Sequence, residues 1–264
     1  MINSQVSNNS QSLNSSQAAQ HFQTSQHSHA AQHITPLPTG EGPGVGLLGF
    51  CALLSSSYFP PIQWMQKLHR YGRVIVEQHD NFCKQTYRNR CLIATANGVQ
   101  ALTVPIERYD GAKCPMCDIR ISDHGEWRHQ HWNAIVSAYG ESPFFVYYED
   151  DIRPFFERKW DYLVDFNMAI TNKLCELLDV QPNVQLSDEY IDAEALRSQL
   201  NAEGGAEVRV DDFRDAIRPK RPLPDTSFTP RQYYQVHTLR QGFQPNMSAL
   251  DLLMNEGPEG IFYL

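Results

Sequence analysis

Two short apolar runs on either side of a helical apolar stripe constrain the fold of this chain more than any other feature. Residues 51–56 (CALLSS) predict a strand that ends before the turn Tyr58-Phe59-Pro60-Pro61. An apolar stripe at spacings of three then predicts a helix: Ile62, Met65, Leu68 and Tyr71. Gly72 stands where a left-handed C-cap would end that helix, and residues 74–76 (VIV) predict a second buried strand. This order predicts a β-α-β unit with a parallel pair of strands.

A hairpin is predicted next, because Asn97-Gly98 lies between the apolar runs 91–95 and 101–106. Its two strands would be antiparallel. We therefore predict an α/β fold, a single domain with a mixed sheet and flanking helices. Residues 1–44 are mostly Ser, Gln, Asn, His, Gly and Pro and predict a disordered tail before a folded domain of residues 45–264.

The rest of the domain alternates helices and polar segments. Asp123 and Glu126 have capping-box spacing and predict a helix that ends at Gly140. A longer helix is predicted from about residue 155 to 178, and the polar segment 192–208 is interpreted as an exposed excursion. Ser248 and Asp251 again have capping-box spacing and predict the start of a short C-terminal helix.

Composition limits the classes of protein to which the chain can belong. The formal net charge of -8 argues against a nucleic-acid partner, which requires a basic face. No Lys or Arg precedes Lys67, so the basic start of a secretory signal is missing, and the apolar run 45–54 is too short to span a bilayer. Six cysteines in a chain of this kind indicate free thiols. We expect a soluble cytoplasmic protein.

The main candidate site is a cluster of cations. Lys84, Arg88 and Arg90 occur within seven residues of a chain that is acidic overall. Guanidinium groups bind carboxylate or phosphate bidentately, so the cluster predicts a small anionic ligand. On an extended segment Arg88 and Arg90 would share one face while Asn89 points away. We expect the cations to meet the N-terminus of the helix that follows Pro60-Pro61, since helix N-termini bind anions.

Two alternatives to ligand binding concern the same stretch. Glu77 and Asp80 lie close in sequence, so local ion pairs would also explain the arginines. Glu77, His79 and Asp80 are in turn the acid–base candidates of the predicted strand end, because carboxylates and histidines exchange protons near neutral pH. Further acid–base candidates lie on the predicted helix 123–140: His124, His129 and His131.

Cys114 and Cys117 form a Cys-x-x-Cys pair ahead of these histidines. The gap from Cys117 to the first histidine is too short for the common zinc pattern, so we predict no metal and no cofactor. A redox pair and a zinc site remain the alternatives to two ordinary thiols.

The ordered set of motifs resembles the WbqC-like family of bacterial proteins. It comprises YFPPIQW, a strand ending in EQHD, KQTYRNR and LTVPIE, and later DAIRPKRP and PNMSALDLLMNEGPE. Positions that match the family's N-terminal signature are Pro60, Lys84, Arg88, Asn89, Arg90 and Pro105.

The resemblance implies an association with surface-polysaccharide synthesis of the O-antigen type, without an assigned reaction. Our leading hypothesis is a transferase or sugar-modifying enzyme that acts on an anionic substrate such as a nucleotide sugar. Lys84, Arg88, Asn89 and Arg90 would then form the binding site. The alternative hypothesis is a ligand-binding or assembly module of the same pathway without catalysis. The oligomeric state stays open.

Overall fold

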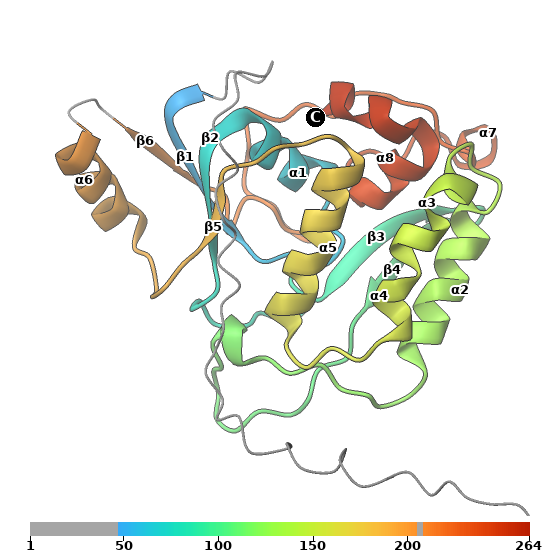
Figure 1. Cartoon of the computed structure of the whole chain (residues 1–264), viewed down its shortest axis with the longest axis horizontal. Helices are drawn as coiled ribbons and strands as arrows, with labels where there is room; N and C mark the ends of the chain where they lie inside the picture. The colour runs from blue at the N-terminus through green and yellow to red at the C-terminus, as the bar shows by residue number, and fades with distance from the viewer. Residues whose placement is uncertain (1–46, 205–207) are drawn as a thin grey trace, which may run out of the picture. The chain divides into compact units, whose positions relative to one another are not determined.

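The computed structural model describes residues 47–204 and 208–264, and the predicted tail of residues 1–44 lies outside this part. A four-stranded sheet lies at its centre (Figure 1). The strands are β1 (Leu47–Ser55), β2 (Tyr71–Glu77), β5 (Val184–Leu186) and β6 (Arg209–Asp212). They lie in the order β5-β2-β1-β6, and every neighbouring pair is parallel. The predicted β-α-β unit is confirmed, since Ala52 aligns with Val74 in the β1–β2 register.

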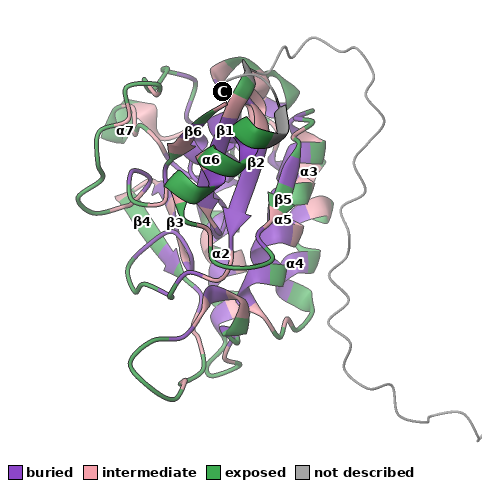
Figure 2. Ribbon diagram, turned by 90° about the vertical axis from the view of Figure 1, so that its left-hand side faces the viewer, coloured by how far each residue is buried: buried purple, intermediate pink, exposed green. Residues whose placement is uncertain are grey.

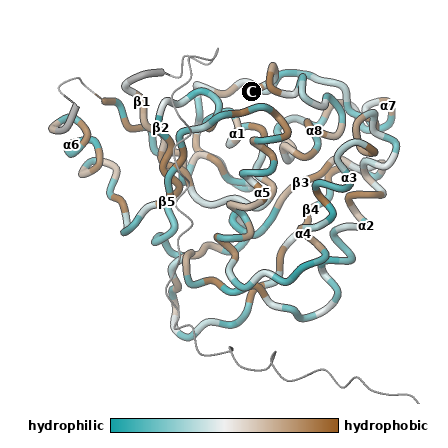
Figure 3. The backbone as a smooth tube through the Cα atoms, viewed as in Figure 1, coloured by the Kyte–Doolittle hydropathy of each residue, from teal (hydrophilic) through white to brown (hydrophobic). Residues whose placement is uncertain are grey.

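Alternate residues of the central strands face two different helical layers. Leu54 and Val76 belong to the main core, which also contains residues of α1 (Ile62–Arg70) and α5 (Leu163–Leu177). Leu53 packs instead in a smaller cluster with Leu196 and Leu200, both from α6. Helix α6 (Ala193–Gly204) lies on the opposite side of the sheet from α1 and α5 (Figure 1). Because both faces are covered, the two central strands are buried and apolar over residues 51–54 of β1 and 74–76 of β2 (Figures 2 and 3).

The predicted hairpin forms, with its turn at Ala96-Asn97 and Gly98 as the first residue after the turn. β3 (Arg90–Thr95) and β4 (Gly98–Thr103) are antiparallel, and Gly98 has a φ of 105° that favours glycine. The α/β class with flanking helices is confirmed, but the hairpin is a separate two-stranded sheet and the larger sheet is purely parallel. One reason is that Ser248, ahead of α8, donates its amide to the carbonyl of Leu92 at 2.9 Å. That contact occupies part of the hairpin backbone.

The remaining elements surround the hairpin and the main core. They are η1 (Met116–Asp118), α2 (Trp127–Tyr139), α3 (Phe145–Ile152), α4 (Pro154–Glu157), α7 (Thr238–Gln241), α8 (Ala249–Glu256) and η2 (Gly257–Tyr263). Helix α2 ends at Gly140 as predicted.

Two predicted helix boundaries are wrong. Helix α1 ends at Arg70, and Tyr71 is already extended (φ -91°, ψ 135°), so Gly72 is part of β2 and caps nothing. Helix α2 begins at Trp127, after the predicted start at Asp123. The carboxylate of Asp123 pairs with Arg128 and Lys159 instead of capping the helix. Helix α1 continues directly into strand β2, and at α2 ion pairs of Asp123 replace the predicted cap.

Two longer segments also differ from prediction. The expected helix 155–178 is divided into α4 and α5, because the chain becomes extended at Arg158 (φ -102°, ψ 159°). The polar segment 192–208 contains α6, whose buried leucines cover the outer face of the sheet. A mostly polar helix is sufficient there, since two leucines four residues apart share one side.

The C-terminal helix α8 begins as predicted. Ser248 is its N-cap, and its Oγ accepts a hydrogen bond from the amide of Leu250 at 3.2 Å. Asp251 does not complete a capping box, because its buried carboxylate accepts hydrogen bonds from the Tyr233 hydroxyl at 2.5 Å and from Gln235 at 2.8 Å. The helix start is thus local, while Asp251 joins α8 to the segment that contains Tyr233.

Substitution of Gly257 tests the end of α8. Gly257 has a φ of 60°, and an added Cβ would lie 2.5 Å from the Phe144 ring. Gly257→Ala is expected to reduce the free energy of unfolding by about 3 kcal/mol, the sum of left-handed strain and overpacking. Gly125→Ala is the control, since its φ is 72° and nothing lies within 4 Å. It should lose about 1 kcal/mol in urea unfolding. Equal losses of unfolding free energy in the two variants would contradict a clash between the added Cβ and the Phe144 ring.

Candidate functional site

The carboxyl edge of the parallel sheet contains a reversal of strand order. From β1 the chain adds β2 and then β5 on one side, and it later adds β6 on the other side of β1. Ligands of open α/β sheets bind in the crevice at such a switch point, beyond the carboxyl ends of the strands. Here that crevice lies between the end of β1 at Ser55 and the end of β6 at Asp212.

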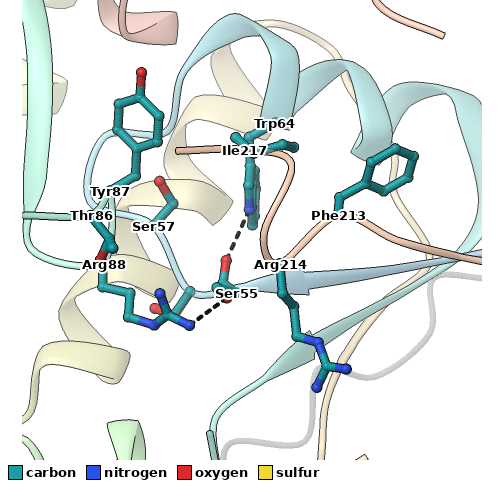
Figure 4. Close-up of a pocket in the computed structure, with 10 residues that line it drawn as sticks. Ser55, Ser57, Trp64, Thr86, Tyr87, Arg88, Phe213, Arg214 and Ile217 are labelled. Carbon is teal, nitrogen blue, oxygen red and sulfur yellow. Dashed lines mark hydrogen bonds between the residues drawn. The ribbon is translucent and has the colours of Figure 1, made fainter. Parts of the chain in front are cut away.

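A small pocket opens at this switch point (Figure 4). It contains about 250 Å³ of empty space, open solvent included. The part enclosed by protein has room for only about one water-sized group, so the pocket admits an oxygen of a small polar group and not a whole nucleotide sugar. The loop after β1, helix α1, the turn before β3 and the segment after β6 supply the lining. The lining residues are Ser55, Ser56, Ser57, Trp64, Thr86, Tyr87, Arg88, Phe213, Arg214 and Ile217.

Arg88 is the buried cation of this pocket. Its side chain is 5% exposed, and its Nη2 forms an ion pair with the carboxylate of Asp80. The same nitrogen donates to Ser55 Oγ at 2.8 Å (Figure 4). Asn167 of α5 donates its Nδ2 to the backbone carbonyl of Arg88, also at 2.8 Å. The residue is therefore held through its side chain and its backbone, and the ion pair expected as an alternative is present.

Several buried polar atoms around Arg88 have no hydrogen-bond partner among the described residues. They include Arg88 Nε, Ser57 Oγ and Asp80 Oδ1. A buried polar group without a partner costs about 1–3 kcal/mol, so a bound group that satisfies it is favoured. Arg88 and Ser57 both line the pocket and both can donate. This combination favours a ligand with acceptor oxygens, such as a phosphate or carboxylate.

An apolar wall faces these donors. Trp64 donates its Nε1 to the carbonyl of Ser55 at 3.0 Å, which fixes the indole beside the strand end. Phe213 is supported from behind by Lys67, whose ammonium lies 4.4 Å from the ring centroid and 2.7 Å from the Asp225 carboxylate. Burial lowers the pKa of Lys67, although the hydrogen bond to Asp225 opposes that change. The Lys67–Asp225 ion pair thus packs against Phe213 and does not line the pocket.

Glu77, an acid–base candidate, is fully buried at the end of β2. Its Oε1 accepts from the His79 amide at 2.7 Å and from Ser187 Oγ at 2.8 Å, and its Oε2 accepts from the Ile191 amide at 2.7 Å. Arg214 Nη1 lies 3.7 Å from Oε2. Both oxygens are occupied, so this geometry suits an anchor between strand ends better than proton transfer.

The other two acid–base candidates differ in their surroundings. Asp80 uses Oδ2 for Arg88 and lies 3.4 Å from Ser55 Oγ through the same oxygen, which leaves Oδ1 without a described partner. His79 is half-buried, and its Nδ1 lies 3.7 Å from Cys117 Sγ. The structure therefore brings Asp80 to the arginine of the pocket and directs the His79 ring towards Cys117.

The remaining candidates of the cation cluster separate in space. Residues 84–89 form turns, so Arg88 and Arg90 do not share the face expected of an extended segment. Arg90 begins β3, where its Nε donates to Thr103 Oγ1 at 3.1 Å across the hairpin. Asn89 is buried and donates its Nδ2 to the carbonyl of Val104 at 2.9 Å. Lys84 is exposed.

The N-terminus of α1 does not face an anion. Its first amides are occupied, since Ile62 donates to the carbonyl of Met247 at 3.0 Å and Gln63 to Asn246 Oδ1 at 2.9 Å. The predicted convergence of the cations with this helix end is therefore wrong. The segment before α8 fills the position, because the amides of a helix N-terminus need acceptors wherever the helix packs inward.

The three histidines near α2 do not form a cluster. His124 and His129 are exposed. His131 is buried, its Nδ1 forms a 2.9 Å hydrogen bond with the Tyr58 hydroxyl, and its ring lies edge-on to Trp127 at 5.2 Å. Burial lowers the pKa of His131 from 6.5 to about 4. The ring is therefore neutral near pH 7 and belongs to the core.

The Cys114–Cys117 segment supports the loop after β2. Hydrogen bonds of 2.8 to 2.9 Å between backbone groups join it to Gln78, Asp80 and Phe82. Burial is the main cause that raises the pKa of both thiols. Within residues 47–204 and 208–264, no three His, Cys, Asp or Glu side chains are arranged to hold a metal ion.

Sequence reasoning missed Arg214 and the serines 55–57. Arg214 is 13% exposed in its side chain, and its Nη2 lies 2.6 Å from the Asp212 carboxylate. It follows β6, a strand of four residues directly after the predicted excursion, which the sequence analysis did not predict. The serines directly follow a correctly predicted strand, so the rule that placed residues 77–80 at the carboxyl edge applied to them as well.

The fold and site define a class: an α/β protein with a parallel sheet and a small cationic pocket at its switch point. The WbqC-like protein family matches residues 55–263, which include every lining residue of the pocket, and this chain belongs to that family. A protein of Mycobacterium tuberculosis (strain ATCC 25618 / H37Rv), described as uncharacterized protein Rv1507c, is 24% identical over 226 residues. That match covers 81% of this chain and 96% of the relative. No solved structure matches the chain significantly.

Within the described part of the chain, no helix is both long and apolar enough to cross a membrane.

Acid unfolding tests the core position of His131. Its folded pKa of about 4 lies below the ordinary 6.5, so between these values the unfolded chain binds a proton that the folded chain does not. Stability is therefore lost as the pH falls through this window, by about 2 kcal/mol from pH 7 to pH 5. His131→Gln should remove this part of the pH dependence in urea unfolding.

His129→Gln is the matched control for that measurement, because His129 lies on the same helix and is exposed. Its pH profile should equal that of the unsubstituted protein. The same loss of pH dependence in both variants would contradict the assignment to His131.

Proposed function

We propose that this WbqC-like protein binds the anionic group of a small substrate in the pocket between the ends of β1 and β6. The activity we assign to it is that of a transferase or sugar-modifying enzyme in surface-polysaccharide synthesis. The observation that carries the proposal is Arg88, a buried guanidinium that lines the pocket and keeps Nε without a described partner. A charged side chain in that position is favoured when a ligand completes its hydrogen bonds.

The residues around Arg88 would contact different parts of the substrate. Ser57 lines the same pocket with its hydroxyl directed away from the Arg88 guanidinium (Figure 4), and Trp64 and Phe213 supply an apolar surface for the less polar part of the substrate. Arg214 lies on the other side of Ser55 and lines the crevice, where its charge is paired with Asp212 (Figure 4). Asp80, through its free Oδ1, is the proton acceptor that this geometry favours.

The size of the pocket limits which part of the substrate enters. The enclosed space is about that of one water molecule, so a phosphate or carboxylate group would enter by an oxygen atom. A nucleotide sugar would insert only its anionic part, and the remainder would lie outside the crevice. The carboxyl edge of a parallel sheet, open at its switch point, permits that arrangement.

Arg88→Lys tests the proposal without leaving Asp80 unpaired. Lysine keeps the positive charge but lacks the planar fork that binds an oxyanion bidentately. In a thermal-shift screen of nucleotide sugars, nucleoside phosphates and acyl-carrier compounds, a true ligand at about 100 times its Kd should raise Tm by about 5 °C or more. Arg88→Lys should remove most of that shift.

Arg90→Lys is the matched control, since Arg90 lies two residues away and contacts Thr103 outside the pocket. Its ligand shift should equal that of the unsubstituted protein. The proposal fails if both variants keep the full shift, or if both lose it equally.

A binding module without catalysis is the second candidate function. It is favoured by one observation: the carboxylate of Glu77 is fully occupied and that of Asp80 is half occupied by structural partners. An anchor of this kind holds a pocket in shape and needs no proton transfer.

Asp80→Asn separates the two functions. The amide oxygen of Asn still accepts a hydrogen bond from Arg88, while the proton acceptor is lost. If the protein is an enzyme, turnover of a ligand found in the screen should fall about 100-fold while its Kd changes less than about threefold. Unchanged turnover would exclude Asp80 as the base, and a ligand without turnover in the unsubstituted protein would favour the binding module.

A further inference from the structure

Two basic loops meet at the mouth of the Arg88 pocket. Lys220 donates its Nζ to Gln85 Oε1 at 3.1 Å, so the segment after β6 contacts the turn before β3. Thr86 adjoins Gln85 and lines the pocket, and so does Ile217, three residues before Lys220. This contact therefore places exposed cations from both loops at one rim.

The charges of this rim are not balanced locally. Arg214 and Arg218, closer to the strand, pair with Asp212 and Asp215. Three exposed residues form no ion pair within the described chain, and we name them the rim cations: Lys84, Lys220 and Arg221. Neighbouring like charges repel, so an anion bound between the loops would relieve that repulsion.

The second loop is restrained in a way that favours binding. Arg221 lies between Pro219 and Pro222 on either side of the loop, and has a φ of 51°, which is uncommon for a residue other than glycine. Proline fixes its own φ and restricts the residue before it. A loop with few accessible conformations loses little entropy when a ligand orders its side chains.

We infer that the site takes an organic diphosphate, with one phosphoryl group at Arg88 and the next at the rim cations. This inference rests on the proposed function and names its substrate class. A single carboxylate or phosphate would fill the inner pocket and leave the rim cations without a role. A diphosphate spans both positions and leaves its organic part outside, in agreement with the small volume of the pocket.

Inorganic pyrophosphate and orthophosphate are the probes, each titrated calorimetrically into the whole protein. The unsubstituted protein should bind pyrophosphate at least about tenfold more tightly than orthophosphate. Tenfold in Kd corresponds to about 1.4 kcal/mol, which two exposed ion pairs of up to about 1 kcal/mol each can supply. The double variant Lys84→Ala/Lys220→Ala should weaken pyrophosphate about tenfold and orthophosphate less than about threefold. Added salt should reduce the preference, because exposed charges are screened at about 1 M.

Arg153→Ala/Lys159→Ala is the control for net charge. Both residues are exposed, neither lines the pocket, and the substitution removes the same number of positive charges as the test variant. Its affinities for both anions should stay within about twofold of the unsubstituted protein. An equal loss of pyrophosphate affinity in the two double variants would overturn the inference, since only general charge would then be at work.

The outcomes separate the inference from the proposed function. If Arg88→Lys abolishes binding of both anions while Lys84→Ala/Lys220→Ala changes neither, the proposed function stands and the diphosphate assignment is overturned. If neither anion binds the unsubstituted protein and the thermal-shift ligand is also missing, the proposed function fails as well. Preference for orthophosphate over pyrophosphate would overturn the inference on its own.

Discussion

The buried ion pair between Arg88 and Asp80 determines the geometry of the carboxyl edge. It joins the turn before β3 to the end of β2, and Arg88 continues the connection to Ser55 at the end of β1. Buried pairs add little net stability, because removing two charges from water is expensive, but loss of one partner leaves an unpaired charge. The main effect of the pair is therefore to position the Arg88 guanidinium in the pocket, and its contribution to the free energy of unfolding is small.

A second carboxylate makes that position possible. Glu77 accepts three hydrogen bonds from groups that lie beyond the ends of β2 and β5 and lies close to Arg214, so it holds the strand ends and the segment after β6 together. The two acidic side chains that looked catalytic in the sequence thus hold most of the edge in place. In the proposed function the ligand is bound by the cations, first by Arg88 and then by the rim cations.

Much of the framework could be predicted from local patterns. The parallel β1–β2 pair, the hairpin at Asn97-Gly98 and the start of α8 at Ser248 depend on periodicity and turn chemistry within a few residues. The boundaries that failed depend on distant partners. Asp123 is predicted to cap α2 but pairs with Lys159 instead. Strand β6 is short, and it is defined by its parallel pairing with β1. Local capping signals compete with tertiary contacts, and the tertiary contact prevails where it also satisfies a charge.

The candidate site divides in the same way. The sequence by itself determined an α/β chain with a β-α-β start and a cluster of cations beside a strand end. Only the tertiary structure decided which cation is buried. Arg88 and Arg90 are identical side chains two residues apart, yet one lies in a turn that faces the switch point and the other begins β3 and contacts Thr103. The difference arises because residues 84–89 turn where an extended segment is predicted. This turn contacts β1, the loop after β2 and α5, and no local sequence pattern records those contacts.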